Sequence, residues 1–349
     1  MNKDNYVSTE NMLQDYQGIV KAKSVPEDVN VVSFSCGDIL ISNIRPYLKK
    51  VWKATFNGGC SSDVFVLKAN DNIESDYLHY VIANDKFINF VMSGAKGVKM
   101  PRGDKKQMET YSLSLPQIQE QHKIARLLSL LDERIATQNK IIEDLKKLKS
   151  AIIDYAINSL DTDFAKFGSL YEMAGEGGTP TTSNASFYDN GKIPFIKIDD
   201  LKKKYLTENK DFITELGLQK SSAWLIPTHS ILFSNGATIG EITITTYPVC
   251  TKQGILGIVP KQNIDVEFLY YFMSSSYFKK AVSRIVTEGT MKTAYLKDIN
   301  NILCPIPTKE KQQEIAKMPS ALNSKTDFEQ SILKLFCSQK QHLLRQMFI

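Results

Sequence analysis

Basic and aromatic side chains, rather than catalytic groups, carry the chemical information in this sequence. It contains no phosphate-binding G-x-x-x-x-G-K-[ST] loop, no H-E-x-x-H metal motif, no G-x-S-x-G nucleophile and no G-x-G-x-x-G turn. Gly177 and Gly178 could suggest a phosphate loop, but no Lys-Ser/Thr pair follows, and a structural turn explains them better. Asp199 and Asp200 could bind a metal, yet a turn accounts for both. We therefore expect no active site, no metal site and no cofactor.

Clusters of Lys and Arg on expected loops could bind DNA phosphates, and neighbouring amides could read bases. One cluster, between Arg45 and Lys53, has four basic and two aromatic residues and no acid, and a Gly-rich loop sets five basic residues against Asp104. An ordinary solvated surface is the alternative. The candidate DNA-binding residues are Arg45, Tyr47, Lys49, Lys50, Lys96, Lys99, Arg102, Lys105, Lys197, Lys202, Lys203, Asn235, Thr238, Lys252, Gln253 and Lys292, with Lys204 as a further candidate.

A long helix must position these loops. Residues 115–160 contain no Gly and no Pro after Pro116, which suits a first helical turn. Apolar residues recur there at heptad spacing, and about 40 residues at 1.5 Å each form a rod of roughly 60 Å. The ten seam positions are Ile124, Leu128, Leu131, Ile135, Gln138, Ile142, Leu145, Lys149, Ile152 and Ala156, and all but Gln138 and Lys149 are apolar.

This helix is one half of an internal repeat with an offset of 191 residues. Gln121 falls on Gln312, and the polar seam residue Lys149 falls on Lys340, which two unrelated helices would not do at one constant offset. We expect an α+β fold in which two mixed α/β domains each precede a long helix. The helices should form an antiparallel coiled-coil spacer around a pseudo-twofold axis. The expected segments are domain 1 at 1–114, helix 115–160, domain 2 at 161–305 and helix 306–349.

Local patterns outline the first domain. Val31–Ser42 and Ser61–Ala69 are rich in β-branched and aromatic residues and are expected to be strands. Asp76–Ser93 has helical spacing, with Asp76 as the expected N-cap.

Composition limits the class of protein. With 349 residues and 42% hydrophobic content, the chain has room for about two globular domains. No apolar run approaches a membrane span and the start lacks a signal peptide, so we expect a cytoplasmic protein without a membrane partner. The five cysteines are widely spaced, which predicts reduced and mostly buried thiols. A net charge of +5 is too small to prove a polyanionic partner.

Taken together, the sequence resembles the specificity subunits of type I restriction-modification enzymes. The resemblance rests on the repeated phrase at 115–125 and 306–316, on Gly177–Pro180 and Ile193–Phe195, and on the turn Ser234–Gly240. It implies that each domain is a target recognition domain for one half of a split double-stranded DNA site, with the helices setting the gap. It also implies a noncatalytic chain that holds two methyltransferase subunits, which carry S-adenosylmethionine, and the ATP-driven endonuclease subunits.

Other hypotheses stay open at this point. The chain could be a stand-alone DNA-binding or antirestriction module derived from such a subunit, or an enzyme that itself acts on DNA.

Two features depart from the pattern of the family. The first domain has no counterpart of residues 161–192, so we expect it to be truncated at its start, with Tyr6–Asn11 equivalent to Tyr205–Asn209. Pro319 replaces the seam residue Leu128 in the second copy. Because a proline inside a helix costs about 3 kcal/mol, we expect the second helix to be bent or split there.

Overall fold

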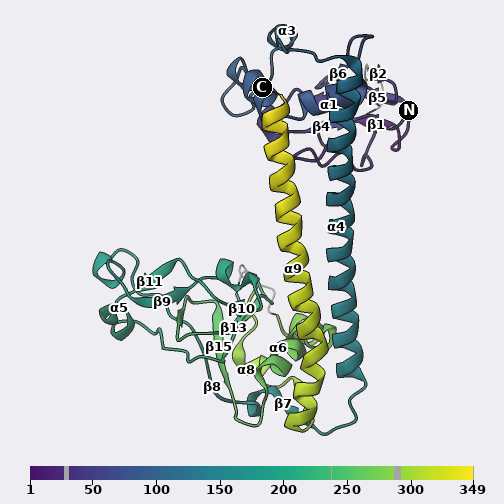
Figure 1. The fold of residues 1–349 in the computed structure, drawn as a ribbon. Helices are drawn as coiled ribbons and strands as arrows, with labels where there is room; N and C mark the ends of the chain where they lie inside the picture. The colour runs from purple at the N-terminus through teal and green to yellow at the C-terminus, as the bar shows by residue number, and fades with distance from the viewer. Residues whose placement is uncertain (27–30, 237, 287–291, 349) are drawn as a thin grey trace. The chain divides into compact units, whose positions relative to one another are not determined.

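The computed structural model describes residues 1–26, 31–236, 238–286 and 292–348 and forms two compact units (Figure 1). Unit 1 comprises Met1–Lys140 and Gln330–Ile349, and unit 2 comprises Ile141–Glu329. Each unit combines one mixed domain with parts of both long helices. Among the described helices, none is long and apolar enough to span a bilayer.

In the described part of unit 1, two small sheets, the 3-10 helix η1 and three short α-helices precede the long helix. One sheet has the strand order β1-β5-β2, with β1 parallel to β5, and the other is antiparallel with the order β4-β3-β6. The elements are β1 (Tyr6–Val7), β2 (Val32–Phe34), β3 (Ile39–Ser42), η1 (Pro46–Leu48), β4 (Val51–Lys53), β5 (Gly58–Cys60), β6 (Val64–Leu67), α1 (Ser75–Ile82), α2 (Asp85–Ser93), α3 (Lys105–Glu109) and α4 (Ile118–Asn158).

Two local predictions for unit 1 were too coarse. The strand expected at Val31–Ser42 is two strands, because a turn with Gly37 at φ 94° sends β3 into the other sheet. The helix expected from Asp76 is also two helices. Glu74, not Asp76, caps α1 by accepting a hydrogen bond from the Tyr77 N–H, and Asn84 starts α2 in the same way.

Unit 2 is built around a five-stranded sheet with the order β10-β13-β12-β15-β8. A three-stranded sheet, β11-β9-β14, and a two-stranded sheet, β16-β7, accompany it. The elements are β7 (Phe164–Lys166), η2 (Phe167–Ser169), β8 (Tyr171–Glu176), η3 (Ala185–Phe187), β9 (Ile193–Ile196), η4 (Ile198–Lys202), β10 (Tyr205–Leu206), β11 (Asp211–Ile213), α5 (Glu215–Gln219), β12 (Ile231–Ser234), β13 (Ile242–Thr245), β14 (Cys250–Thr251), β15 (Ile255–Pro260), α6 (Val266–Ser274), α7 (Ser276–Ile285), α8 (Leu296–Ile299), β16 (Leu303–Pro305) and α9 (Lys309–Met347).

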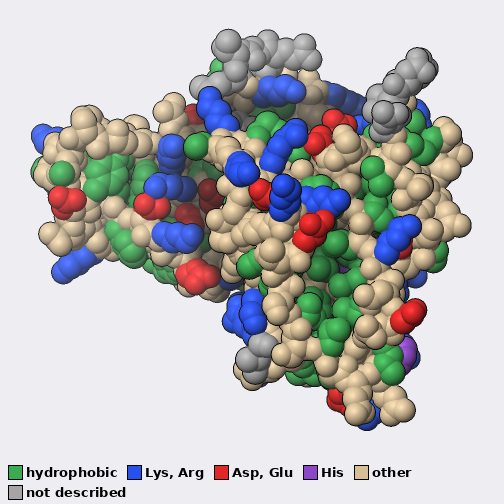
Figure 2. Space-filling view, turned by 90° about the horizontal axis from the view of Figure 1, so that it is seen from above, with side chains coloured by type: hydrophobic (Ala, Val, Ile, Leu, Met, Phe, Trp, Pro, Cys, Tyr) green, Lys and Arg blue, Asp and Glu red, His purple; other side chains and the backbone are tan. Residues whose placement is uncertain are grey.

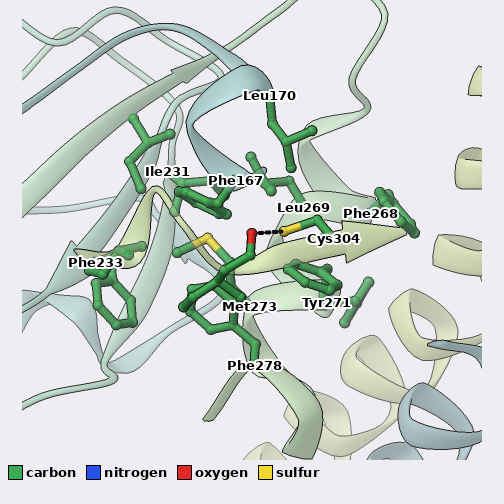
Figure 3. Close-up of a cluster of buried hydrophobic side chains, with 14 of the residues drawn as sticks. Phe167, Leu170, Ile231, Phe233, Phe268, Leu269, Tyr271, Met273, Phe278 and Cys304 are labelled. Atoms are coloured by element: carbon green, nitrogen blue, oxygen red, sulfur yellow. Dashed lines mark hydrogen bonds between the residues drawn. The ribbon is translucent and has the colours of Figure 1, made fainter. Parts of the chain in front are cut away.

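The main core of unit 2 lies between the five-stranded sheet and helices α6 and α7. Phe167, Phe233, Met273 and Phe278 meet there, and Cys304 donates a weak hydrogen bond to the Ile302 carbonyl at 3.5 Å (Figure 3). Both long helices add side chains to this core, from the end of α4 and from the start of α9.

The repeat extends to the cysteines, but the equivalence expected at the N-terminus is wrong. Cys60 and Cys250 are buried at corresponding strand positions, and burial raises the pKa of each thiol to about 11. Val7 pairs with Cys60 as Phe195 pairs with Cys250, so β1 corresponds to β9. Tyr205 instead pairs with β13, the counterpart of β4. Of the other thiols, Cys304 is buried, whereas Cys36 and Cys337 are exposed.

The predicted helical seam is confirmed. None of its ten positions is exposed, and the side chains of Leu128, Leu131, Gln138 and Ile142 are buried. In unit 1, Lys340 of α9 pairs with Asp132 of α4, and Arg134 lies over the Phe336 ring, so the two helices are antiparallel.

The repeated seam lysines have matched partners. In unit 2, the Lys149 Nζ donates to the Asn323 Oδ1 at 2.8 Å, at the position where Lys340 meets Asp132 in unit 1. Burial lowers the pKa of Lys149, and the charge of Asp327 opposes this effect. Each lysine interrupts the apolar seam but retains a polar partner.

A buried glutamine fixes the start of each long helix to its own domain. The Gln121 Oε1 accepts from the Glu74 N–H at 2.8 Å, and its Nε2 donates to the carbonyls of Asn72 (3.0 Å) and Pro116 (2.9 Å). In unit 2, Gln312 makes the same three bonds. Their partners are the Asp265 N–H (2.8 Å), the Asn263 carbonyl (3.3 Å) and the Pro307 carbonyl (2.9 Å).

The expected split at Pro319 is wrong. Helix α9 is continuous through this residue, which is buried, although its ring nitrogen cannot donate to the Ile315 carbonyl (Figure 1). The burial pattern of Gln121–Ser129 is identical to that of Gln312–Ser320, so packing holds the helix in register despite the missing hydrogen bond.

We expect Gln121→Ala and Gln312→Ala each to lower the free energy of unfolding by about 1–3 kcal/mol. Each substitution leaves an N–H and two carbonyls of the domain without their partner, in a buried site. Urea unfolding checks this expectation. Gln119→Ala removes an exposed glutamine from the same helix and is the control. An equal loss of unfolding free energy in Gln119→Ala and Gln121→Ala would contradict the stabilising role of the Gln121 hydrogen bonds.

Alanine substitutions at the equivalent positions Leu128 and Pro319 should change the stability of the protein in opposite directions. Leu128 is fully buried, so Leu128→Ala should destabilise the protein by roughly 2–5 kcal/mol. Pro319→Ala restores a helical N–H and relieves a penalty of about 3 kcal/mol, part of which the lost ring contacts offset. Thermal unfolding should therefore show a lower Tm for the first variant and a higher Tm for the second. A lower Tm for Pro319→Ala would show that the ring is needed for packing.

Candidate nucleic-acid interface

Two basic segments of unit 1 that are far apart in sequence lie side by side. The Arg45 N–H donates to the Pro101 carbonyl at 2.7 Å, and the Gly103 N–H donates to the Asn43 carbonyl at 3.0 Å. The unit 1 face is the surface formed by these segments. It comprises Arg45, Tyr47, Lys96, Lys99, Arg102 and Lys105.

Most cations of the unit 1 face are exposed and are paired with acids of the same unit. Arg102 lies 3.4 Å from Asp63, and Lys96 lies 3.0 Å from Asp104. Lys105 meets Glu109 at 3.8 Å on the surface of α3. Exposed pairs of this kind contribute little to stability, so a phosphate can replace the carboxylate at small cost. Blue Lys and Arg side chains beside red Asp and Glu are visible on the surface seen in Figure 2.

Lys99 differs from the other cations of the unit 1 face. Its side chain is exposed and makes no ion pair with any described residue. Arg45 is half-buried, and its Nε has no hydrogen-bond acceptor in the part of the chain that the structure describes.

Two of the candidate lysines, Lys49 and Lys50, are half-buried and bond to other parts of unit 1. Lys49 pairs with Asp85 at 2.7 Å, and the Lys50 Nζ donates to the Thr9 carbonyl at 2.5 Å. Burial, and then the charge of Arg45, lowers the pKa of Lys50. The sequence did not show that these lysines differ in accessibility from Arg45 and Tyr47, because the strained turn around η1 decides where each side chain lies. Arg45 and Lys49 both adopt left-handed φ values, of 50° and 54°, on either side of η1.

Four segments of unit 2 meet at one end of its five-stranded sheet. The Asn235 N–H donates to the Gly254 carbonyl at 3.0 Å, and the Ala294 N–H donates to the Asn235 carbonyl at 2.9 Å. The Gly254 N–H in turn donates to Glu176 Oε1 at 2.9 Å, and the Gln253 N–H donates to Thr179 Oγ1 at 3.3 Å.

We name this end of the sheet the unit 2 face. Its exposed polar side chains include the predicted Thr238, Lys252, Gln253 and Lys292, and the half-buried Thr179 lies beside them. Thr179 is not among the predicted candidates, although the Gly-Gly-Thr-Pro motif had marked its position. The face is polar and carries fewer cations than the unit 1 face.

Asn235 does not belong to the exposed set. It is only 2% exposed, and its Nδ2 donates inward to the Ala294 carbonyl at 3.3 Å. Direct base reading by this amide is therefore not supported by its placement.

The remaining lysines of unit 2 fall into two groups. Lys197, Lys202 and Lys203 are exposed and meet Asp211 (2.8 Å), Asp199 (3.2 Å) and Glu208 (3.0 Å), respectively. Lys197 lies beside the unit 2 face, because the Lys252 N–H donates to the Ile196 carbonyl at 2.9 Å.

Lys204 is structural. Its side chain is 2% exposed and lies 2.7 Å from Glu267 and 3.0 Å from the Ser320 hydroxyl. The rings of Tyr205 and Tyr271 surround its ammonium group, each at 4.7 Å. Burial alone would raise the pKa of Glu267, but hydrogen bonds from Lys204, Ser320 and Tyr205 outweigh it and lower that pKa. The cluster fastens α9 to α6 and the sheet.

The glycines of the suspected phosphate loop have a packing role. A Cβ at Gly177 would lie 2.2 Å from Thr251 Oγ1, and one at Gly178 would lie 2.3 Å from the Ala223 nitrogen. Both positions need glycine because the backbones approach closely. No group of metal-binding side chains occurs among the described residues.

Comparisons with known proteins agree with this architecture. The sequence model of the type I restriction modification DNA specificity domain matches residues 2–147 and 161–335. The putative type I restriction enzyme MjaX specificity subunit of Methanocaldococcus jannaschii is 26% identical over 325 residues, which is 85% of this chain and 74% of that protein. The EcoR124I/EcoR124II specificity subunit of Escherichia coli is 24% identical over 214 residues, covering 58% of this chain and 52% of that protein.

Solved structures show the same fold. The type I restriction-modification S subunit of M. genitalium has a TM-score of 0.58 at 17% identity, with 100% of this chain and 93% of that chain covered. A chain from a study of assembly and conformational transition in a type I restriction-modification system has a TM-score of 0.64 at 17% identity. That match covers 98% of this chain and 90% of that chain.

Lys99→Ala should weaken binding to double-stranded DNA similarly for all sequences. If its free ammonium group contacts phosphate, the slope of log K against log [salt] should fall by about one contact. Filter binding at several salt concentrations measures the slope. Lys21→Ala, which removes an exposed lysine paired with Asp4, is the control. Equal slopes for wild type and Lys99→Ala would mean that Lys99 is ordinary solvated surface.

Proposed function

Because the chain belongs to the type I restriction-modification DNA specificity family, we propose that it recognises a bipartite site on double-stranded DNA. Unit 1 would contact one half of the site and unit 2 the other. The observation that carries this proposal is the convergence, in each unit, of loops distant in sequence into one polar or basic surface. Surface lysines placed at random would not be expected to gather on the converging strand-end loops in both repeats.

The two faces would contact DNA in different ways. On the unit 1 face, Arg45, Lys96, Lys99 and Lys105 would bind phosphates, and Arg102 would also contact base edges, with Tyr47 exposed beside them. On the unit 2 face, Gln253 and Thr238 would contact base edges, because amides and hydroxyls can discriminate between bases. Lys197, Lys252 and Lys292 would hold the backbone in place, and Lys202 and Lys203 lie farther along the same domain. Lys49, Lys50 and Asn235 are left out because their side chains are engaged within the protein.

The chain is a noncatalytic subunit, so methyl transfer and cleavage need partners. We infer that methyltransferase subunits dock on the long helices and that endonuclease subunits join the complex. Exposed apolar side chains on α4 support docking there. Leu127 and Leu130 are 42% and 40% exposed in unit 1, and Leu148 is 48% exposed in unit 2. Exposed leucines at helical spacing favour a protein partner over solvent.

Replacement of residues 161–305 by the same domain of another family member should change one half of the recognised DNA site and leave the other half unchanged. The reason is that only the loops of unit 2 are exchanged. Single-molecule sequencing of DNA modified by the chain with its methyltransferase subunits reads out the methylated adenines. A contiguous site, or no change after the exchange, would overturn bipartite recognition.

The alternative function is a stand-alone DNA-binding or antirestriction module. Co-purification separates the two functions. A stable complex with methyltransferase subunits supports the specificity subunit, whereas a chain that binds DNA and captures no such subunit supports the alternative.

A further inference from the structure

One asparagine occupies the same place in both repeat units. Asn43 is the first residue after β3 in unit 1. Its N–H donates to the Asp63 carbonyl at 2.8 Å, and its carbonyl accepts from the Gly103 N–H at 3.0 Å. The residue therefore joins the end of a strand to two other loops, one of which carries Arg102.

Asn235 makes the equivalent contacts after β12 in unit 2. Its N–H and carbonyl bond to Gly254 and Ala294, at 3.0 Å and 2.9 Å. Gly254 and Ala294 lie 191 residues after Asp63 and Gly103, so both partners follow the repeat. The loops joined by Asn235 are the ones that carry Gln253 and Lys292.

The side-chain amides also agree between the units. In both asparagines the Oδ1 is buried and receives no hydrogen bond from any described residue. Reversing the Asn235 amide would not help, because its Nδ2 already donates to the Ala294 carbonyl at 3.3 Å and an oxygen there would be repelled. A buried acceptor without a donor normally costs about 1–3 kcal/mol, which makes its presence in both copies informative.

We propose that Asn43 and Asn235 are equivalent positioning residues, each of which sets the spacing of the DNA-contacting loops in its own unit. This inference rests on the proposed function of the two faces. Each backbone holds three segments together, and each Oδ1 offers an acceptor to a donor that arrives when the loops close on DNA. A hydrogen bond formed only in the bound state favours that state.

Base contacts should suffer more than phosphate contacts when this spacing changes. A hydrogen bond to a base edge depends on distance and direction, whereas a long cationic side chain can follow a phosphate. Loss of the amide should therefore reduce sequence discrimination before it reduces general DNA binding. A residue that served only stability would not produce this difference.

The test uses the chain in complex with its methyltransferase subunits. Asn43→Ala and Asn235→Ala are compared with wild type and with Asn158→Ala, which changes an exposed asparagine at the end of α4. For each Asn→Ala variant at 43 or 235, the Kd for the recognised duplex should rise about tenfold, a change of about 1.4 kcal/mol. The Kd for a scrambled duplex and the salt slope should stay unchanged. Methylated-site mapping should show relaxed sequence in one half-site for Asn43→Ala and in the other for Asn235→Ala.

Three results would overturn the inference. They are an equal rise in Kd on both duplexes, relaxation of both half-sites by a single substitution, or no change of the methylated sequence. If Asn235→Ala does not fold, as judged from its Tm, Asn43→Ala decides alone by the same criteria in its own half-site. Gln253→Ala tests the proposed function separately. If Gln253→Ala relaxes a half-site and the asparagine variants do not, only the positioning role is contradicted. If Gln253→Ala also has no effect, DNA recognition by the unit 2 face is contradicted, and the positioning role of Asn235 is contradicted with it.

Discussion

Three hydrogen bonds from one buried glutamine at the start of each long helix hold the rest of the structure in order. Gln121 and Gln312 receive the N–H that precedes α1 or α6 and donate to two carbonyls of the loops beside it. A glutamine amide can satisfy three polar groups at once, whereas an apolar residue would leave all of them buried and unpaired. The direction in which each helix leaves its domain is thereby fixed by a side chain and not only by the connection before it.

The same backbone frame serves two different surfaces. Strand ends, buried cysteines, helix caps and the asparagine after the central strand recur in both units, but the loops between them do not. Unit 1 places a strained Arg45–Lys49 turn where unit 2 has the Gly-rich turn after Asn235. Because packing constrains the frame and solvent borders the loops, the loops can vary without loss of the fold. Two unlike half-sites are then compatible with one duplicated scaffold.

Periodicity in the sequence was enough to find the helices, the repeat and the buried seam, because heptad spacing follows directly from helix geometry. Prediction from periodicity failed where tertiary packing decides whether a helix continues or whether a side chain is accessible. Pro319 remains inside an intact helix because its neighbours are packed as in the first copy. Lys49, Lys50, Lys204 and Asn235 had the right residue type for DNA contact, but each is buried or half-buried and bonds to a group of its own unit. The exposed candidate DNA-binding residues lie close together because the strands that precede them end at the same edge of a sheet. Residue type alone does not reveal this proximity.

The two-part composition of unit 1 has a consequence for synthesis of the chain. Leu343 and Leu344 of the last turns of α9, and Phe348 just after it, pack against the core formed by β3, α1 and α2. A ribosome delivers those last turns only after all of unit 2 has been made, so the first domain emerges early but completes its core late. Until then its apolar surface stays open to chaperones and proteases. Folding of the amino-terminal domain is in this way coupled to the synthesis of α9, and a chain that stops before α9 would be recognised by its unfinished first domain.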